Sequence, residues 1–171
     1  MDYNIRLATL NDARKLAEVK IACWETTYRG IYPDEKLDNY DVLKNAEKFE
    51  TIISREDIDL YVVEVNGEIV GYMSCGVPVR SYADYEQEIG LLYLLKEFRG
   101  QGIGRELIEL ASSVISMKGY DRFFISCNKY NEPAKRFYEA MGGVIVHSDE
   151  DNEDKSIPQV KYHYDIMKIG D

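Results

Sequence analysis

The sequence predicts an α/β or α+β fold, in which helices cover the faces of a central sheet. Three observations carry this prediction. Asn66-Gly67 joins two β-rich segments and is a strong hairpin signal. Past the middle of the chain, a strand, a glycine-rich turn and a helix follow one another directly. Near its end, apolar and polar residues alternate as in a strand with one buried face, the apolar positions being Val160, Tyr162, Tyr164 and Ile166.

The first half of the chain is predicted to hold a strand, three helices and the hairpin. Thr9 and Asn11-Asp12 are candidate caps for the first helix, which Gly30 ends. Pro33 fits the first turn of the second helix. The expected elements are a strand over residues 3–7, helices over 13–28, from 33 onward and over 42–54, and strands over 60–65 and 68–75.

The second half alternates strands and helices. Gly119 closes the helix that follows the glycine-rich turn, and Pro133 opens a further helix that Gly142-Gly143 ends. The acidic run over residues 149–154 is expected to be a solvated loop. The expected strands cover residues 88–95, 122–127, 144–147 and 160–166, and a polar loop over 80–85 precedes the first of them.

Composition and charge restrict the class of protein. The 171 residues, 45% of them hydrophobic, suit one domain over residues 1–171 and leave no room for a second of typical size. No apolar run approaches the ~20 residues of a membrane helix, and no basic segment leads into an apolar one at the start, so we expect a cytoplasmic protein. The net charge of −10 disfavours nucleic acid as a partner. It favours solubility first, and it would also attract a cationic small molecule.

Cysteine and histidine usage gives no sign of a metal site. Cys23, Cys75 and Cys127 are far apart and lie among apolar neighbours, so we expect small buried side chains in a reducing compartment. His147 and His163 have no Cys or His at ligand spacing. We therefore expect neither a disulfide framework nor a bound metal.

The glycine-rich turn, Arg99-Gly100-Gln101-Gly102-Ile103-Gly104-Arg105, is the most informative segment. Such a turn leaves backbone N–H groups free, and the following helix adds a partial positive charge at its N-terminus. A phosphate or pyrophosphate is the natural ligand of this arrangement. The same glycines would also serve a tight connection without a ligand, and their spacing alone does not decide between the two interpretations.

Two well-known phosphate loops do not match this turn. A Walker loop ends in Gly-Lys-Ser/Thr, which does not occur here. A dinucleotide fingerprint needs G-x-G-x-x-G, whereas Gly100 and Gly102 are followed by Gly104 and Arg105. A nucleotide-dependent oxidoreductase or kinase is therefore disfavoured, and absence of nicotinamide or ATP binding would exclude it.

The turn Arg99-x-x-Gly102-x-Gly104 resembles the acyl-CoA motif of the GNAT superfamily of N-acetyltransferases, Q/R-x-x-G-x-G/A. Downstream, Asn131-x-x-Ala134-x-x-Phe137-Tyr138-x-x-x-Gly142 is similar to the second cofactor segment of that family. With the opening strand, the stretch over residues 24–38 and the last strand, the resemblance covers nearly the whole chain. It implies a mixed, mostly antiparallel sheet of about six to seven strands with helices on both faces.

The sequence departs from the pattern of the family at two positions. Gly143 stands where an aromatic residue often follows the helix, and Lys96 stands where proline is common. Both departures concern packing and turn shape, so the phosphate argument is little affected.

The resemblance also implies how acetyl-CoA would bind as co-substrate. Strand residues 92–94 would face the pantetheine arm, backbone amides of residues 100–105 would hold the pyrophosphate, and Asn131 would hydrogen-bond the cofactor. The cofactor-binding residues expected in this way are Leu92, Tyr93, Leu94, Arg99, Gly100, Gln101, Gly102, Ile103, Gly104, Arg105 and Asn131.

The implied reaction is direct acetyl transfer to a primary amine, which must lose a proton because its pKa is ~10. Glu88 is the first candidate base, since alternation places it on the strand face of Leu92 and Leu94; Glu86 shares that parity and is the second. Tyr138 would lie near the sulfur and protonate the departing thiolate. An unpaired N–H near Leu94 would bind the carbonyl oxygen. In a plainer interpretation both glutamates mark a solvated strand end and Tyr138 is a packed core residue.

The acceptor cannot be read from the sequence. Trp24 and Tyr28, together with Tyr32 and Tyr40, are candidates to line the amine site, because aromatic faces attract cations; ordinary packing would use the same residues. Small molecules, peptide N-termini and lysine side chains all remain open. The alternative function is a non-catalytic acyl-CoA-binding or regulatory module, which would release no CoA with any amine. An exposed edge strand would allow a homodimer.

Overall fold

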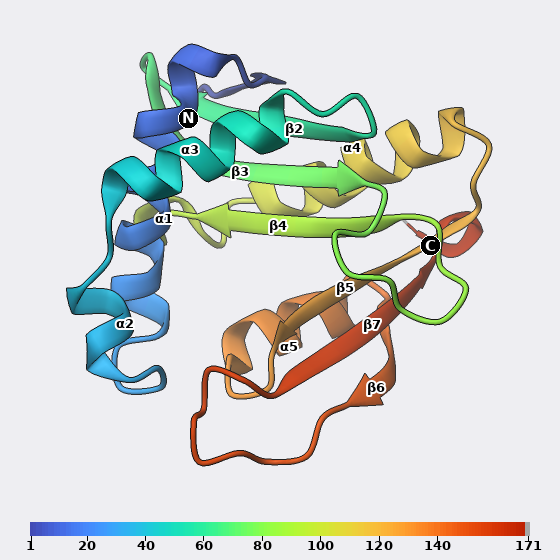
Figure 1. Cartoon of the computed structure of the whole chain (residues 1–171). Coiled ribbons are helices and arrows are strands. Elements are labelled where there is room, and N and C mark those ends of the chain that lie inside the picture. Colours follow the sequence, from blue (N-terminus) through green and yellow to red (C-terminus); the bar gives the residue numbers. More distant parts are fainter. Residues whose placement is uncertain (170–171) are drawn as a thin grey trace.

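The computed structural model describes residues 1–169 and contains one seven-stranded sheet with helices on both faces (Figure 1). The strand order is β1-β2-β3-β4-β5-β7-β6, and each neighbouring pair is antiparallel except β4 and β5, which are parallel. The predicted fold class is confirmed. The strands are β1 (Asn4–Leu7), β2 (Ile58–Val65), β3 (Glu68–Gly76), β4 (Glu88–Leu94), β5 (Arg122–Asn128), β6 (Val144–Ser148) and β7 (Gln159–Asp165).

The helices lie near the predicted ranges. They are α1 (Ala13–Thr27), α2 (Asp34–Asp38), α3 (Val42–Ile53), α4 (Ile103–Met117) and α5 (Glu132–Ala140), with short 3₁₀ turns at Leu10–Asp12, Lys96–Phe98 and Ile166–Lys168. The apolar face of α4 packs on one side of the sheet, and α5 packs on the same core. On the other side of the sheet, α1 and α3 cover β2 and β3. Within residues 1–169, no helix combines the length and apolarity needed to span a bilayer.

The hairpin between β2 and β3 forms at the predicted dipeptide. Asn66 and Gly67 have φ values of 52° and 79°, and Val65 pairs with Glu68 across the two-residue turn. Two consecutive residues with positive φ are the requirement of a type I′ turn, whose twist matches that of the flanking strands. This hairpin sets the register of β2 against β3 next to the turn.

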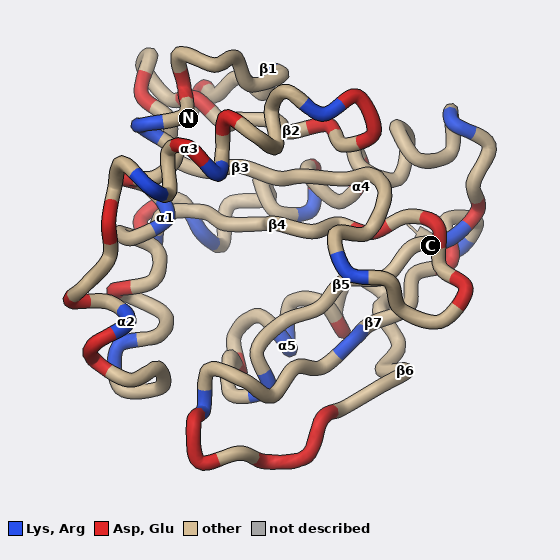
Figure 2. The backbone as a smooth tube through the Cα atoms, viewed as in Figure 1, with Lys and Arg blue, Asp and Glu red and all other residues tan. Residues whose placement is uncertain are grey.

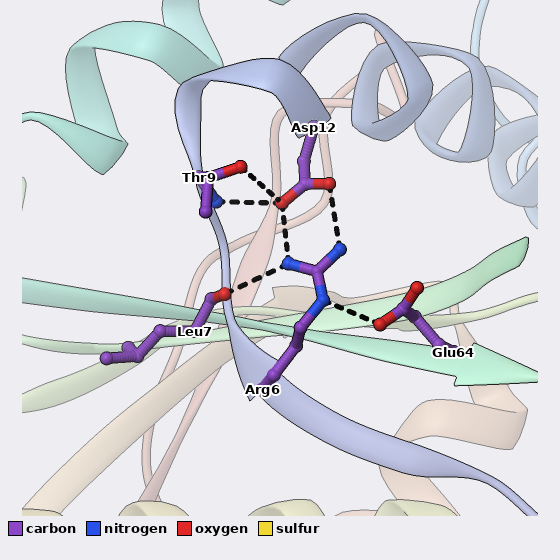
Figure 3. A network of polar contacts seen from close by, with 5 residues as sticks. All are labelled: Arg6, Leu7, Thr9, Asp12 and Glu64. Carbon is purple, nitrogen blue, oxygen red and sulfur yellow. Dashed lines mark hydrogen bonds and ion pairs between the residues drawn. The ribbon is translucent and has the colours of Figure 1, made fainter. Parts of the chain in front are cut away.

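A polar network joins the first strand to the first helix (Figure 3). The Arg6 guanidinium donates to both carboxylate oxygens of Asp12 at 2.8 and 2.9 Å and to Glu64 at 2.6 Å. Asp12 also accepts from the backbone N–H of Thr9 at 2.7 Å. The hydrogen bonds from Arg6 hold the pKa of Asp12 below its ordinary value. Their stabilising contribution is therefore present above the ordinary pKa of aspartate and is lost as the pH falls through the lowered one.

The sheet opens between β4 and β5, and this opening positions the candidate site. The two strands share the pairs Glu88↔Phe124 and Ile89↔Ile125, after which β4 continues without β5 as far as Leu94. Figure 1 shows the two strands diverging, with α5 on the side of β5. At the same point β4 carries a β-bulge, because Cys75 pairs with Ile89 and Ser74 pairs with Leu91, which leaves Gly90 unpaired.

Candidate active site

A cavity of about 610 Å³ lies where β4 and β5 diverge, and we call it the glycine-turn cleft. It is lined by the second half of β4, the turn before α4, the end of β5 and α5. Such a volume suits a bound small molecule. The cleft brings together most of the predicted site residues, namely Tyr28, Leu92, Tyr93, Leu94, Arg99, Gly100, Gly102, Gly104, Arg105, Asn131 and Tyr138.

The turn presents free backbone donors to this cleft. Among the described residues, none of the six N–H groups from Gly100 to Arg105 donates a hydrogen bond within the protein. The first backbone bond of α4 comes from Glu106, whose N–H reaches the carbonyl of Gly102 at 3.2 Å. Gly100 and Gly102 are exposed and have φ values of 74° and 89°, which side chains rarely adopt. The start of α4 thus carries unpaired donors, and those of Gly100, Gln101, Gly102 and Arg105 belong to exposed residues, which suits an anion.

The third glycine of the turn is needed for a different reason. A Cβ on Gly104 would lie 2.9 Å from Cζ of Phe137, so the absence of a side chain lets α4 and α5 approach closely. Phe137 belongs to α5 and also lines the cleft. Gly104 therefore positions the helix that carries Asn131 at its start and Tyr138 in its last turn.

Three residues of the turn have structural side chains. The Arg99 guanidinium donates to the carbonyl of Leu94 at 2.9 Å and to the Thr27 hydroxyl at 3.3 Å, tying the end of β4 to α1. Gln101 donates to the carbonyl of Glu97 at 3.1 Å, and the side chain of Ile103 is fully buried in the core. Neither Gln101 nor Ile103 lines the cleft. The predicted cofactor role of Gln101 therefore falls to its exposed backbone N–H, whereas Ile103 is fully buried and anchors α4 in the core.

Asn131 begins α5 and faces the cleft. Its side-chain oxygen accepts from the backbone N–H of Ala134 at 3.2 Å and caps the helix. Its amide nitrogen lies 3.4 Å from the hydroxyl of Tyr28, whose ring stacks on Tyr32 with centroids 4.1 Å apart. The cap fixes the side chain, so that its amide nitrogen remains directed towards the cleft.

Tyr138 is buried in the wall of the cleft, but its hydroxyl has no hydrogen-bond partner among the described residues. Burial raises the pKa of Tyr138 well above its ordinary value, so the phenol keeps its proton at neutral pH. The hydroxyl of Tyr164 holds the backbone carbonyl of Tyr138 at 2.6 Å. A Cβ on Gly143 would lie 2.9 Å from the ring of Tyr164. The ring of Tyr164 thus packs where Gly143 lacks a side chain, which accounts for this departure from the family pattern.

A second cavity, of about 590 Å³, lies on the other side of the bulge, and we call it the Glu88 pocket. Gly90, Ser126 and Gln159 line both cavities, so the two adjoin where β4 separates from β5. The remaining walls come from α2, the end of β3 and the loop after it, and the segment before β7, through Lys36, Ser74, Val79, Arg80, Ser156 and Ile157 among others.

Glu88 is in this pocket, but the predicted reason for its placement is wrong. The bulge at Gly90 breaks the alternation, so Glu88 lies on the strand face of Leu91 and not on that of Leu92 and Leu94. Its carboxylate accepts from the N–H of Val79 at 2.9 Å, and desolvation by burial raises its pKa above the ordinary value. Glu86, the second candidate, is exposed and lines neither cavity.

Of the four aromatic candidates for the amine site, two line a cavity and two, Trp24 and Tyr40, line neither cavity. Tyr28 and Tyr32 line the glycine-turn cleft and not the Glu88 pocket. Trp24 lines neither cavity, because its ring packs edge-on against Tyr28, Tyr32 and Tyr40 with centroids 5.4 to 6.2 Å apart. Trp24 therefore supports the wall of the cleft from behind.

All three cysteines are buried, as predicted. Burial raises the pKa of the thiols, to about 11 for Cys23 and about 12 for Cys75 and Cys127. Cys127 lines the cleft, but at neutral pH its thiol stays protonated and is a poor nucleophile. Within the described part of the chain, no group of three His, Cys, Asp or Glu side chains is placed to hold a metal ion.

Comparison with known proteins places these features in a family. Residues 19–143 match the model of the acetyltransferase (GNAT) family. The chain is 30% identical, over 147 residues, to the uncharacterized N-acetyltransferase YuaI of Bacillus subtilis, with 85% of this chain and 82% of that protein covered. It is 24% identical, over 154 residues, to spermidine N(1)-acetyltransferase of Thermoplasma acidophilum, with 87% of this chain and 92% of the relative covered.

Solved structures share the fold. The crystal structure of the PaiA N-acetyltransferase from Thermoplasma acidophilum in complex with coenzyme A superposes with a TM-score of 0.79. It covers 96% of this chain and 99% of its own, at 22% identity. The YncA structure from Salmonella typhimurium, described with its cofactor acetyl-CoA, gives a TM-score of 0.70 at 18% identity and covers 99% and 96% of the two chains.

Proposed function

Because the chain belongs to the GNAT family of acetyltransferases, we propose that it moves an acetyl group from acetyl-CoA directly to a primary amine on a small molecule or peptide. The observation that carries the proposal is the set of six unpaired N–H groups from Gly100 to Arg105 at the start of α4. Unpaired N–H groups at the N-terminus of a helix are suited to binding an anion, and most of these belong to exposed residues. The activity is assigned to residues 1–171 as one domain, since a single sheet takes strands from both ends of the described chain.

In this proposal the glycine-turn cleft holds acetyl-CoA. Backbone groups of Gly100–Arg105 bind the diphosphate, and β4 between Gly90 and Leu94 offers its unpaired edge to the pantetheine amides. The amide nitrogen of Asn131 donates to the Tyr28 hydroxyl at the wall of the cleft and has a second N–H to offer the cofactor. These contacts place the thioester near the bulge, where the two cavities adjoin.

The acceptor amine enters from the Glu88 pocket. Its proton passes to the Glu88 carboxylate, directly or through a water molecule, because only the neutral amine can attack. The amine nitrogen then bonds to the thioester carbonyl carbon, and an N–H on the unpaired edge of β4 supports the oxygen as it becomes negative. As the carbon–sulfur bond breaks, the Tyr138 hydroxyl gives its proton to the departing thiolate. The nitrogen, which became positively charged when it attacked, returns a proton to the Tyr138 phenolate through water, so that a neutral amide and the CoA thiol leave and Glu88 releases the first proton to solvent. No covalent enzyme intermediate is needed, which fits the protonated state of Cys127.

Two measurements test this function. Saturating acetyl-CoA, at about 100 times its Kd, should stabilise the folded protein by ~2.7 kcal/mol and raise its Tm by roughly 5–10 °C. A thiol-release assay against a panel of primary amines should detect CoA above the background measured without amine. A Tm that does not respond to acetyl-CoA would reject the assigned cleft, and CoA release that stays at background with every amine would leave a binding module in place of an enzyme.

A further inference from the structure

The Glu88 pocket is locally basic although the chain carries a net charge of −10. Its charged lining residues are Lys36, Arg80 and Lys161 against the single carboxylate of Glu88. These cations come from α2, from the loop after β3 and from β7, which are far apart in the sequence. Figure 2 shows basic segments on that loop and on β7, whereas acidic segments lie further out, on the loop before β7.

Two of these cations are available to a ligand. Lys161 Nζ donates to the Ser126 hydroxyl at 2.8 Å and lies over the ring of Phe124 at 5.4 Å. Neither Lys161 nor Arg80 forms an ion pair with a carboxylate of the described residues. Lys36 is partly neutralised, because Asp154 lies 3.6 Å from its Nζ. The charges of the pocket that no ion pair neutralises are therefore the positive charges of Arg80 and Lys161 and the negative charge of Glu88.

We propose that the acceptor is an amine that also carries an acidic group, and that Arg80 and Lys161 bind this group while the amine faces Glu88. The proposal rests on the function assigned above. It follows from charge complementarity: a purely cationic polyamine would bring its second ammonium against two unpaired cations, whereas a zwitterion pairs at both ends. The attraction that the overall charge exerts on cations is a property of the outer surface and does not describe this pocket.

The test uses pairs of amines that differ by one acidic group. We expect kcat/KM in a thiol-release assay to be at least tenfold higher for L-ornithine than for putrescine, or for phosphoethanolamine than for ethanolamine. The first pair identifies a carboxylate as the preferred group and the second a phosphate. The preference should shrink as the salt concentration rises, because Arg80 is exposed.

Variants assign the preference to the two cations. Arg80→Ala and Lys161→Met should each reduce it to about threefold or less, and Lys161→Arg should retain most of it. Arg14→Ala and Lys44→Met are matched controls, since both residues are exposed and lie outside the pocket, and they should leave it unchanged. Unaltered Tm values would show that the variants fold.

The outcomes separate this proposal from the function on which it rests. Equal or faster release of CoA with the amine that lacks the acidic group, in both pairs, would overturn the acidic acceptor and leave the acetyltransferase intact. The acidic acceptor would also be overturned if both cation variants kept the preference. Background release of CoA with all four amines, and with the wider panel, would instead reject the acetyltransferase function.

Discussion

The glycine-turn cleft and the Glu88 pocket adjoin at Gly90 but differ in the kind of group that each offers to a ligand. The cleft presents mainly backbone: six N–H groups at the start of α4 and the unpaired edge of β4. The pocket presents side chains from several separate elements, among them Glu88, Arg80 and Lys161. Backbone donors serve any chain that keeps the turn, whereas the side chains of the pocket can change one at a time. In the proposed function, the acyl donor is therefore bound by groups that the fold fixes, and the acceptor by individual side chains.

Tyr138 is the side chain of the cleft to which the proposal gives a chemical step, so its removal should have the largest effect. Tyr138→Phe should lower kcat by ~10² or more, because positioned acid catalysis contributes that much, while the Kd for acetyl-CoA changes little. Steady-state rates and a binding titration measure the two effects. Tyr162→Phe is the matched control, since that hydroxyl is buried, unpartnered among the described residues and outside the cleft. Wild-type turnover in Tyr138→Phe would remove the acid role.

Glu88 is the side chain of the pocket to which the proposal gives a chemical step, and its replacement tests that step. Glu88→Gln keeps an acceptor for the Val79 N–H but cannot take a proton, so kcat/KM for the amine should fall by ~10² with acetyl-CoA affinity unchanged. In the wild type, activity should fall as the pH drops through the raised pKa of Glu88, since the protonated carboxyl is no base. That acid limb should be missing from the variant.

Glu86→Gln is the control, because Glu86 is exposed and outside both cavities. If the acid limb survives in Glu88→Gln and disappears in Glu86→Gln, the base has been assigned to the wrong residue.

The backbone character of the cleft can be tested with a β-branched residue in the turn. Gly102→Val should cost ~1–3 kcal/mol of stability, because φ is 89° there, and should weaken acetyl-CoA binding about tenfold or more. Gly119→Val carries the same strain at φ 94°, away from the cleft, and should lose stability without losing affinity. Equal acetyl-CoA affinities for the two variants would contradict a phosphate grip by the turn.

Asn131 should give the smallest effect, since its two side-chain atoms have separate roles. Asn131→Ala removes the helix cap and should lower stability by ~1 kcal/mol, or roughly 2–4 °C in Tm. Asn131→Ser keeps a capping oxygen and should recover that stability, yet both variants should bind acetyl-CoA a few-fold more weakly, as expected for one lost hydrogen bond. Wild-type affinity in the serine variant would reduce Asn131 to a capping residue.

The two cavities also differ in how far the sequence predicts them. Local chemistry specifies the turn of the cleft: a strand, glycines that permit φ of 74° and 89°, and a helix start lie within a few consecutive residues. Individual strands were predictable for a similar reason, because Asn66-Gly67 and the alternation in β7 act over short distances, whereas the arrangement of the sheet was expected from the family resemblance. Segments of this kind carry their own structural signal.

The pocket was not predictable, because its walls meet only through tertiary packing. In the sequence, Lys161 is a polar position on the outer face of the last strand, and Arg80 is part of a loop. The parity argument for Glu88 failed at Gly90, although an isolated glycine inside a strand is a recognised sign of a bulge. The position of Trp24 behind the wall of the cleft was not predictable, because its helical spacing does not reveal which neighbours shield its ring.

The junction of β4 and β5 has a mechanical consequence. Two residue pairs join these strands, and beyond them the halves of the sheet are united by apolar side chains packed beneath α4 and α5. Such packing has no preferred direction, so it resists a small sliding motion far less than a ladder of backbone bonds does. A ligand that contacts both β4 and β5 would hold the two halves of the sheet together. Hydrogen exchange at the amides of β5 should therefore slow most when such a ligand binds.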